Sequence, residues 1–276
     1  MNLIFTKMQG LGNDFVVIDA INQSIQLDAV QIRAIADRHF GVGCDQILLV
    51  EKPVSHNADF KYRIFNADGS EVSQCGNGAR CFARFVRDKG LVDKTEVVVD
   101  TNAGQLRLVY ADQGLITVNM GVPKHVPERI PLVANEEALV YQVELAGQTV
   151  NFSAVSMGNP HAVIQVDDVQ TAAVSKWGQL LESHPIFPER VNIGFMQVVA
   201  RNHIRLRVYE RGAAETLACG SGACAAVVAG IELGLLDAHV CVSLPGGDLN
   251  IDWQGRGMPV FMSGPAVSVF EGQIKL

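Results

Sequence analysis

Short runs of apolar residues, separated by residues that favour turns, recur along the whole sequence and predict β-strands. Within each run, apolar positions alternate with polar ones or follow one another over about four to eight residues, the patterns of strands with one or both faces buried. The two halves of the chain contain similar sets. The predicted strands cover 3–8, 15–19, 47–51, 60–65, 96–99, 106–110 and 115–120 in the first half, and 140–145, 162–166, 193–199, 204–209, 240–244 and 260–262 in the second.

Helices are fewer and are indicated by their ends. Asp28 and Asp168 are suitable N-caps, because a carboxylate accepts hydrogen bonds from the free N–H groups of a first turn. Gly90 and Gly234 stand where a helix C-terminus favours glycine. The helix over 221–233 is apolar almost all round, so we expect it to lie inside a curved sheet. The predicted helices cover 29–38, 77–89, 169–181 and 221–233.

The sequence also repeats itself. "RIFNADGSEVSQCGNGA" (63–79) aligns with "RVYERGAAETLACGSGA" (207–223), 144 residues further on. Upstream, "GNDFVVI" (12–18) aligns with "GNPHAVI" (158–164), 146 residues further on. Two similar halves, each a domain, are the simplest explanation. The shared residues include Gly12/Gly158, Asn13/Asn159, Arg63/Arg207, Glu71/Glu215, Cys75/Cys219, Gly76/Gly220, Gly78/Gly222 and Ala79/Ala223.

Breaks in this pattern set the expected domain boundaries. Glycine and two prolines interrupt it at "NMGVPKHVP" (119–127), and "SGPA" (263–266) is a second break. We therefore predict an N-terminal domain over 1–119 that is joined by a returning segment, 265–276, and a C-terminal domain over 120–264. The predicted fold class is α+β, with two pseudo-symmetric domains, each a mixed β-sheet or barrel around a central α-helix.

Composition and charge narrow the function. The formal net charge of the 276 residues is −7 and no basic run is present, which argues against a nucleic-acid partner and favours a small molecule. The N-terminus has no signal-peptide pattern, and the longest apolar stretch, 223–231, is too short to cross a bilayer. A cytoplasmic protein is expected, with no membrane partner, and its six cysteines are expected to be reduced.

Cys75 and Cys219 each stand just before a predicted helix and are followed by Gly-x-Gly. The N–H groups and positive end of a helix favour a bound carboxylate, and the same field can lower a thiol pKa from about 8.5 by several units. Two thiols that flank one carboxylate could remove a proton from one face of the adjacent carbon and return one to the other. The repeat thus favours racemisation or epimerisation by two bases.

Four segments carry a family resemblance. "GLGNDFVVID" (10–19), "FNADGSEVSQCGNGAR" (65–80), "MGNPHAV" (157–163) and "YERGAAETLACGSGACA" (209–225) resemble the signature segments of the diaminopimelate epimerase family. The resemblance implies interconversion of LL- and meso-2,6-diaminopimelate in lysine and peptidoglycan-precursor biosynthesis. It implies a reaction that uses no pyridoxal phosphate and no metal. It also implies a homodimer of two-domain chains. At Phe270, where some relatives have a tyrosine that supports dimerisation, the ring is kept without the hydroxyl.

The resemblance also implies roles for single residues. Cys75 and Cys219 are expected to be the acid and base on opposite faces, with His161 and Glu210 tuning the thiols. Gly76, Asn77, Gly220 and Ser221 match the turns that hold the carboxylate at the reacting centre. The remaining matches are expected to hold the amines and the distal carboxylate of the diamino-dicarboxylate substrate: Asn13, Gln46, Asn66, Asn159, Asn192, Glu210 and Arg211.

Other interpretations remain at this stage. A zinc site would need Cys81 and Cys224 beside Cys75 and Cys219, but these spacings are looser than those of zinc knuckles. A proline or hydroxyproline racemase-like isomerase would use a similar cysteine pair. From other classes, a dithiol redox protein or a catalytically silent amino-acid-binding protein could hold both thiols. Cys44, Cys81, Cys224 and Cys241 are expected to be buried or incidental.

Overall fold

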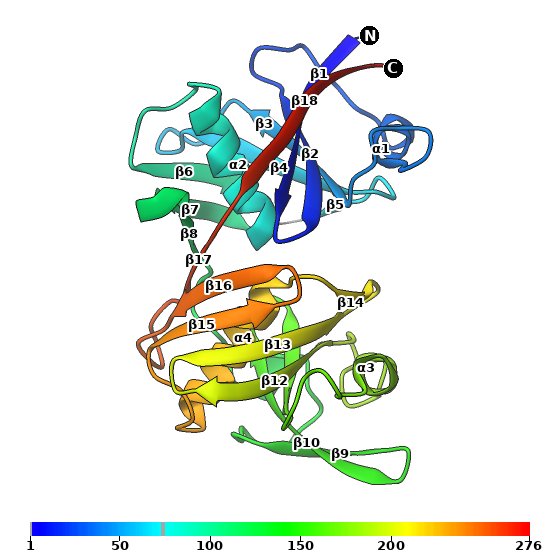
Figure 1. Cartoon of the computed structure of the whole chain (residues 1–276), viewed down its shortest axis with the longest axis vertical. Coiled ribbons are helices and arrows are strands. Elements are labelled where there is room, and N and C mark those ends of the chain that lie inside the picture. The colour runs from blue at the N-terminus through cyan, green and yellow to red at the C-terminus, as the bar shows by residue number, and fades with distance from the viewer. Residues whose placement is uncertain (1, 73–74) are drawn as a thin grey trace. The chain divides into compact units, whose positions relative to one another are not determined.

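The computed structural model describes residues 2–72 and 75–276, and the chain divides into two compact units. Unit 1 contains Met1–Asn119 and Ser263–Leu276, and unit 2 contains Met120–Met262. The two ends of the chain both belong to unit 1, where the last strand runs beside the first (Figure 1).

Unit 1 is a mixed sheet that curves around one helix. Its strands are hydrogen-bonded in the order β18–β1–β2–β3–β4–β6–β7–β8, with β5 beside β4; β2–β3 and β4–β6 are parallel and the other pairs are antiparallel. Helix α2 packs against β1, β2, β3, β7, β8 and β18, so strands surround it. The bounds are β1 Asn2–Gly10, β2 Asn13–Asp19, α1 Ala29–Ala36, β3 Gln46–Glu51, β4 Phe60–Asn66, β5 Glu71–Val72, α2 Gly76–Asp88, β6 Glu96–Thr101, β7 Gly104–Tyr110, β8 Ile116–Asn119 and β18 Val267–Lys275.

Unit 2 repeats this topology. Its strands follow the order β9–β10–β11–β12–β13–β15–β16, with β14 beside β13, and again two pairs, β11–β12 and β13–β15, are parallel. Helix α4 packs against β10, β11, β12, β13 and β16. The bounds are β9 Tyr141–Leu145, β10 Gln148–Ser156, β11 Pro160–Gln165, α3 Val174–Glu182, β12 Asn192–Ala200, β13 His203–Glu210, β14 Ala214–Thr216, α4 Gly220–Glu232, β15 His239–Leu244 and β16 Gly247–Asp252. Strand β17, Phe261–Gly264, crosses the sequence boundary at which the units divide. The predicted α+β class, two similar mixed sheets each around a helix, is confirmed.

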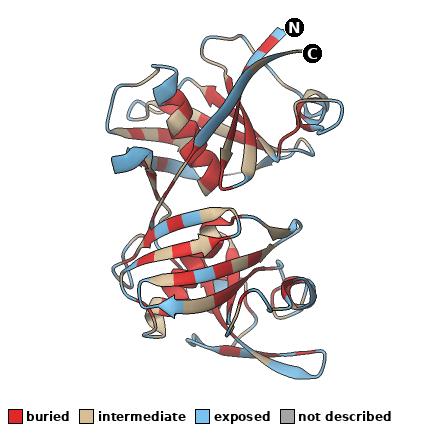
Figure 2. Cartoon of the chain, viewed as in Figure 1, coloured by how far each residue is buried: buried red, intermediate tan, exposed pale blue. Residues whose placement is uncertain are grey.

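The two central helices owe their position to their composition. In α4 every residue from Gly222 to Gly230 is buried, and all are small or apolar, so the strands can approach the helix on all sides (Figure 2). Helix α2 has the same place in unit 1 and also buries most of its length. Strands β7, β9 and β16 alternate between buried and more exposed residues, as strands do when one face of a sheet covers a core. Strands β2, β3 and β11 are buried along most of their length.

Some sequence predictions of elements were wrong. Helix α3 begins at Val174 and not at 169, and Asp168 is not its N-cap. The Asp168 carboxylate instead accepts a hydrogen bond from the Gln170 N–H at 2.9 Å, which closes a local turn. Strands β10, β16 and β18 were not predicted, because their polar positions hide the apolar periodicity; in β18 residues 267–271 are all exposed. The predicted cap at Asp28 is confirmed by a capping box with Gln31.

Gly78 sets how closely α2 approaches the sheet. An added Cβ there would lie 2.6 Å from the Tyr62 hydroxyl oxygen, which itself donates to the Cys75 carbonyl. We expect Gly78→Ala to lower the free energy of unfolding by about 1–3 kcal/mol through overpacking. At the repeat position, Gly222, the nearest atom would be a Val208 methyl at 3.2 Å, so Gly222→Ala should cost distinctly less.

Urea denaturation of the two alanine variants, followed by circular dichroism, measures this difference. Both substitutions gain the same helix propensity, about 1 kcal/mol, so the comparison isolates the packing at each site. An equal loss of stability in both variants, or a loss confined to Gly222→Ala, would contradict the assignment of Gly78 as the tighter contact.

Candidate active site

Cys75 and Cys219 are the N-cap residues of α2 and α4. Both have extended backbones, with φ/ψ of −146°/123° and −122°/107°. Their carbonyl groups accept the first helical bonds, from Ala79 N–H at 2.8 Å and Ala223 N–H at 2.9 Å. The glycine that follows each cysteine starts the helix. Each unit therefore presents a thiol directly at the positive end of its central helix.

In unit 1, two asparagines lie beside the thiol of Cys75, which is half-buried. The Cys75 Sγ is 3.8 Å from Asn13 Oδ1, and Asn77 Nδ2 donates to the same oxygen at 3.4 Å. Asn13 Nδ2 in turn donates to Asp45 Oδ2 at 2.9 Å. The side chains that the sequence predicts at this position are thus brought together, and Asp45 is a member of the group that the sequence analysis missed.

The other two predicted residues of unit 1 lie on neighbouring strands. Gln46 and Asn66 are paired across β3 and β4, and Gln46 Nε2 donates to Asn66 Oδ1 at 2.9 Å. Gln46 is opposite Phe15 on β2, two residues from Asn13. Among the described residues, the buried Gln46 Oε1 has no hydrogen-bond partner. This oxygen is available to accept from a ligand.

In unit 2, the thiol of Cys219 is bonded to a carboxylate. Cys219 is 4% exposed and its Sγ donates to Glu210 Oε2 at 3.0 Å. The other oxygen of Glu210 accepts from Thr216 Oγ1 at 2.6 Å, so the carboxylate is held on both sides. Ser221 Oγ lies 3.7 Å from the sulfur and accepts from Asn159 Nδ2 at 3.3 Å. Thr216 was missed by the sequence analysis, since it has no polar counterpart in the first repeat.

The environment of Cys219 opposes the thiolate. Burial, followed by the charge and hydrogen bond of Glu210, raises the pKa of the Cys219 thiol well above its usual value. The Gly222 N–H and the Ser221 hydroxyl act in the opposite direction, but they are the smaller effects. The lowering that the sequence predicts at a helix end is present at Cys219 through the Gly222 N–H, but burial and Glu210 outweigh it, so a lowered net pKa is not found. The side chain is a neutral thiol near neutral pH.

His161 is neutral as well. It is 1% exposed, and burial, with a smaller effect of Arg211, lowers its pKa to about 3. Its Nε2 lies 3.0 Å from Asn159 Oδ1, so this nitrogen carries the hydrogen and donates. Nδ1 is then an acceptor, buried and without a hydrogen-bond partner in the described part of the chain. His161 reaches the thiol region through Asn159 and Ser221.

Asn192 and Arg211 complete the predicted residues of unit 2. Asn192 is buried; it donates to Pro160 O at 3.0 Å and accepts from the Arg211 N–H at 3.0 Å. The Arg211 guanidinium extends to the surface, where Nη1 donates to Glu189 O at 2.9 Å. Asn192 therefore fixes the backbone of Arg211, and the guanidinium remains accessible to a carboxylate.

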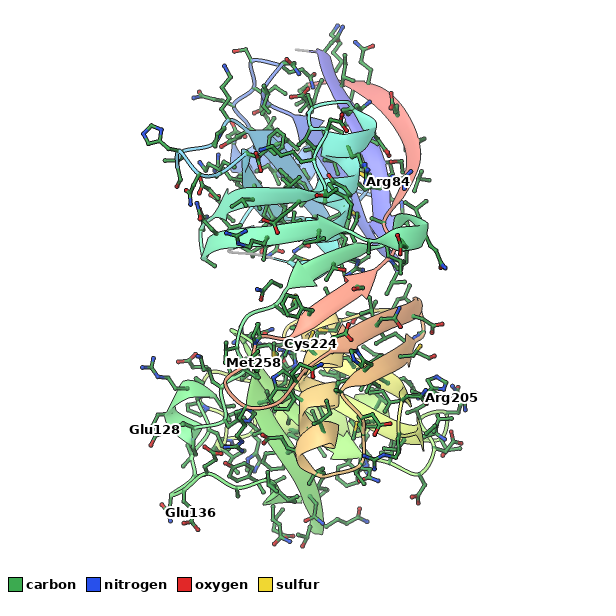
Figure 3. The ribbon with its side chains drawn as sticks, turned by 90° about the vertical axis from the view of Figure 1, so that its left-hand side faces the viewer. Arg84, Glu128, Glu136, Arg205, Cys224 and Met258 are labelled. Atoms are coloured by element: carbon green, nitrogen blue, oxygen red, sulfur yellow. The ribbon has the colours of Figure 1, made fainter. Side chains whose placement is uncertain are left out.

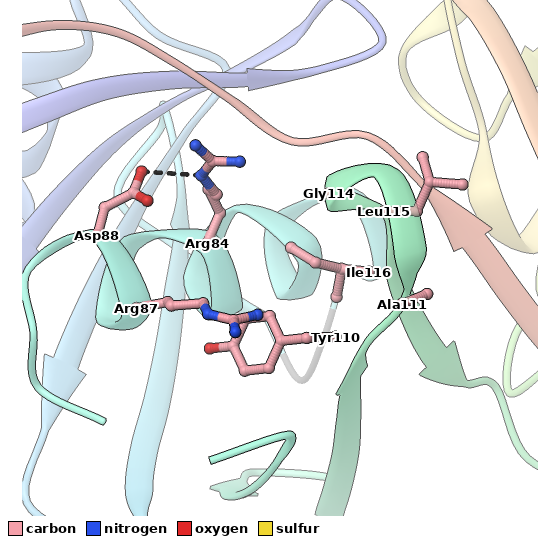
Figure 4. Close-up of a pocket in the computed structure, with 8 residues that line it drawn as sticks. All are labelled: Arg84, Arg87, Asp88, Tyr110, Ala111, Gly114, Leu115 and Ile116. Carbon is pink, nitrogen blue, oxygen red and sulfur yellow. Dashed lines mark hydrogen bonds and ion pairs between the residues drawn. The ribbon is translucent and has the colours of Figure 1, made fainter. Parts of the chain in front are cut away.

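Two of the remaining thiols lie within the central helices, and one cavity lies outside the predicted site. Cys81 and Cys224 are fully buried, within α2 and α4 respectively, and Figure 3 labels Cys224. Burial raises the pKa of Cys81 to about 12. Within residues 2–72 and 75–276, no three His, Cys, Asp or Glu side chains are placed to hold a metal ion. A cavity of about 280 Å³ in unit 1 is lined by residues outside the predicted site (Figure 4): Arg84, Arg87, Asp88, Tyr110, Ala111, Gly114, Leu115 and Ile116.

Among residues 2–72 and 75–276, none of the helices has both the length and the hydropathy that crossing a bilayer requires.

The fold is one that solved epimerase structures share. The crystal structure of a hydroxyproline epimerase from Agrobacterium vitis, with bound trans-4-hydroxy-L-proline, aligns with a TM-score of 0.72. The alignment covers 99% of this chain and 92% of that one, at 15% sequence identity. At this identity the likeness defines the class of fold, an epimerase-type pair of similar mixed sheets.

Sequence relatives define the family. The profile of the diaminopimelate epimerase family matches residues 5–126 and 153–269. A diaminopimelate epimerase from Azoarcus sp. (strain BH72) is 61% identical over 276 residues, and one from Nitrosomonas europaea is 59% identical over 276 residues; each comparison covers 100% of both chains. The chain belongs to the diaminopimelate epimerase family, and it is an isomerase of the amino-acid epimerase class.

Proposed function

We propose that the chain interconverts LL- and meso-2,6-diaminopimelate with Cys75 and Cys219 as a pair of acid and base groups, without pyridoxal phosphate or a metal. The observation that carries the proposal is the duplicated thiol at the start of a central helix, with an asparagine and a helix-start side chain beside it in each unit. The rivals for these cysteines, packed thiols and a zinc site, give no reason for this repeated arrangement.

The proposed reaction moves two protons: one is removed from the α-carbon and another is delivered to its opposite face. A Cys75 thiolate takes the proton from the α-carbon, and the electron pair of the C–H bond moves into the adjacent carboxylate to form an enediolate. The Cys219 S–H then delivers its proton to the opposite face, which inverts the carbon and leaves the thiolate at Cys219. The reverse direction exchanges the roles. The neutral state of Cys219 beside Glu210 supports its part as the proton donor of the free enzyme.

The helix starts would stabilise the enediolate. N–H groups of Gly76 and Asn77 at α2, and of Gly220 and Ser221 at α4, are oriented by the helices before the substrate binds. Preorganised donors of this kind are effective where negative charge develops, because they need no rearrangement during the reaction. This accounts for a reaction in which a very weak carbon acid is deprotonated without an electron-withdrawing cofactor.

The second amino-acid end of the substrate accounts for the remaining polar residues. A distal carboxylate would pair with the Arg211 guanidinium, while a distal ammonium would donate to carbonyl and carboxylate oxygens. The free Gln46 Oε1 is one such acceptor. The other proposed contacts of the diamino-dicarboxylate are Asn13, Asn66, Asn159, Asn192 and Glu210. A racemase of proline or hydroxyproline would have no second zwitterion to engage this set.

The cellular setting follows from the family as a further part of the proposal. We propose a cytoplasmic homodimer that supplies lysine and peptidoglycan-precursor biosynthesis. Phe270 on β18 is 49% exposed, and its ring packs edge-on against Phe5 with centroids 6.0 Å apart. An exposed aromatic ring that is held in place suits a contact with a second chain, although it lacks the hydroxyl that some relatives have there.

The direct test is solvent exchange. Reduced protein is incubated with LL-diaminopimelate in D2O, with entry of deuterium at the α-carbon followed by mass spectrometry and the isomers separated by chromatography. We expect deuterium at each inverted carbon and conversion to the meso isomer. Absence of exchange, exchange with hydroxyproline but not with diaminopimelate, or thiol transfer without exchange would refute the proposal and favour the silent-binding, racemase-like or redox alternative, respectively.

A further inference from the structure

Arg80 is a fully buried cation in the second turn of α2. Its side chain is 0% exposed, although removing a guanidinium from water costs several kcal/mol unless polar partners replace the water. Arg80 Nε donates to Pro265 O at 3.1 Å, and Arg80 Nη2 donates to Asn77 Oδ1 at 3.0 Å. The guanidinium therefore connects the start of α2 with the returning C-terminal segment of unit 1.

The bond to Asn77 determines which way its amide faces. A guanidinium can only donate hydrogen bonds, so Asn77 Oδ1 must face Arg80, and Nδ2 is directed at Asn13 Oδ1, 3.4 Å away. At the other end a carboxylate can only accept, so Asp45 holds Asn13 Nδ2 at 2.9 Å. Both amides beside Cys75 are thus oriented by charged groups, a donor at one end and an acceptor at the other.

The two ends differ in rigidity. The Asp45 side chain is 44% exposed and is held by Arg38 at 2.7 Å, whereas Arg80 is enclosed by protein. Gly10 lies against it: a Cβ at Gly10 would come within 3.3 Å of Arg80 Nη2. Arg80 is therefore the buried end of the hydrogen-bonded series, and loss of it would remove the shorter of the two hydrogen bonds that orient the Asn77 amide, 3.0 Å against 3.4 Å to Asn13.

The internal repeat supports a role tied to Asn77. The position that corresponds to Arg80 in unit 2 is Cys224, and the position that corresponds to Asn77 is Ser221. A hydroxyl both donates and accepts and turns freely, so Ser221 needs no group to set its direction. An amide has an oxygen that only accepts and a nitrogen that only donates, so it does need a neighbouring group to set its orientation. The arginine occurs in the unit that has the asparagine.

We propose that Arg80 is a positioning residue for the reaction, which acts through Asn77 by holding the amide nitrogen toward Asn13 and the Cys75 side of the helix start. This inference rests on the proposed function, because Asn77 matters to the rate if the α2 helix start binds the reacting carboxylate. Arg80 itself does not touch the substrate. Its contribution should therefore vanish when the Asn77 amide is removed.

A double-mutant cycle tests this dependence. Epimerisation and α-hydrogen exchange are measured for the full-length wild type, Arg80→Met, Asn77→Ala and the double variant, with kcat and KM determined separately. We expect Arg80→Met to lower kcat/KM roughly 10- to 100-fold, since small misplacements of positioning groups cost up to about 100-fold. In the Asn77→Ala background the same change should have an effect of less than about 2-fold.

Arg84→Met is the matched control. Arg84 is one turn further along the same helix, and its side chain is 41% exposed and pairs with Asp88 at 2.9 Å, so its loss removes an arginine from α2 without affecting Asn77 (Figure 4). It should leave kcat/KM within about 2-fold in either background. Circular dichroism and thermal unfolding establish that each variant is folded. If Arg80→Met does not fold, Arg80→Lys, which keeps the charge but not the planar fork, replaces it in the cycle.

Full additivity of the Arg80 and Asn77 effects, or wild-type kcat/KM in a folded Arg80 variant, would overturn the inference. Failure of the proposed function gives a different result: the wild type itself would show no exchange of α-hydrogen with solvent. If only the inference about Arg80 fails, the wild type is active and the coupling between Arg80 and Asn77 is absent.

Discussion

Replacing Cys219 with serine is expected to lower kcat/KM for epimerisation by about three orders of magnitude, within the range that general acid–base groups contribute. Serine keeps the size of the side chain and the hydrogen bond to Glu210, which lies 3.0 Å from the sulfur, but its hydroxyl is a far weaker acid. Cys75→Ser should have a loss of similar size. Each variant is assayed for α-deuterium incorporation and for isomer conversion under reducing conditions.

Two other cysteines provide the controls. Cys81 and Cys224 are fully buried in the same two helices, so Cys81→Ala and Cys224→Ala each remove a thiol from α2 or α4 without touching a helix start. These variants should lose some stability, about 1 kcal/mol, and keep their activity. Serine variants at Cys75 and Cys219 that epimerise at the wild-type rate would exclude the two-thiol reaction.

The second large effect concerns acid stability. His161 has a pKa of about 3 in the folded chain and 6.5 when unperturbed, because burial disfavours its charged form. The depressed value means that folding favours neutral His161. This contribution to stability is complete above pH 6.5 and is lost as the pH falls toward 3. Between pH 7 and pH 4, His161 alone should lower the free energy of unfolding by about 3 kcal/mol.

Urea unfolding at pH 7 and pH 4 measures this contribution. His161→Gln should show a pH-dependent loss that is smaller than that of the wild type by about 3 kcal/mol, whatever its stability at pH 7. His203→Gln is the matched control: His203 is also in unit 2, but it is half-buried and bonded to Ser243 at 3.0 Å. Identical losses in the wild type and His161→Gln would show that this histidine is not the acid-sensitive group.

Much of the fold could be predicted because short local patterns mark the ends of the two central helices. Helices α2 and α4 begin within one residue of their predicted starts, since Cys-Gly-x-Gly marks both N-termini and glycine marks both C-termini. The start of α3 was misplaced because Asp168 serves a turn, a use that an N-cap pattern does not distinguish. Strand β18 was missed because residues 267–271 are all exposed and give no pattern of buried positions.

For the candidate site, the sequence predicted which residues take part but not how their surroundings shift their pKa values. Hydrogen bonds join some of the named residues within each unit: Asn13 and Asn77 beside Cys75, and Glu210, Ser221 and Asn159 beside Cys219. The catalytic roles of all of them remain predictions. The raised pKa of Cys219 comes first from its burial and then from Glu210, which precedes it by nine residues and lies at the end of β13. Arg80 contacts Pro265, 185 residues away in sequence. Such contacts depend on how the strands fold back, and local patterns do not contain them.

The pairing of β1 with β18 has a consequence for the order in which the protein is made. Unit 2 is a continuous segment, Met120–Met262, so all of its residues have been synthesised before the ribosome reaches β18. Unit 1 still lacks an edge strand and the Pro265 carbonyl that Arg80 binds. Domains generally fold as units during synthesis. The Cys219 unit is therefore complete in sequence before the Cys75 unit, whose edge strand and Arg80 partner follow it along the chain.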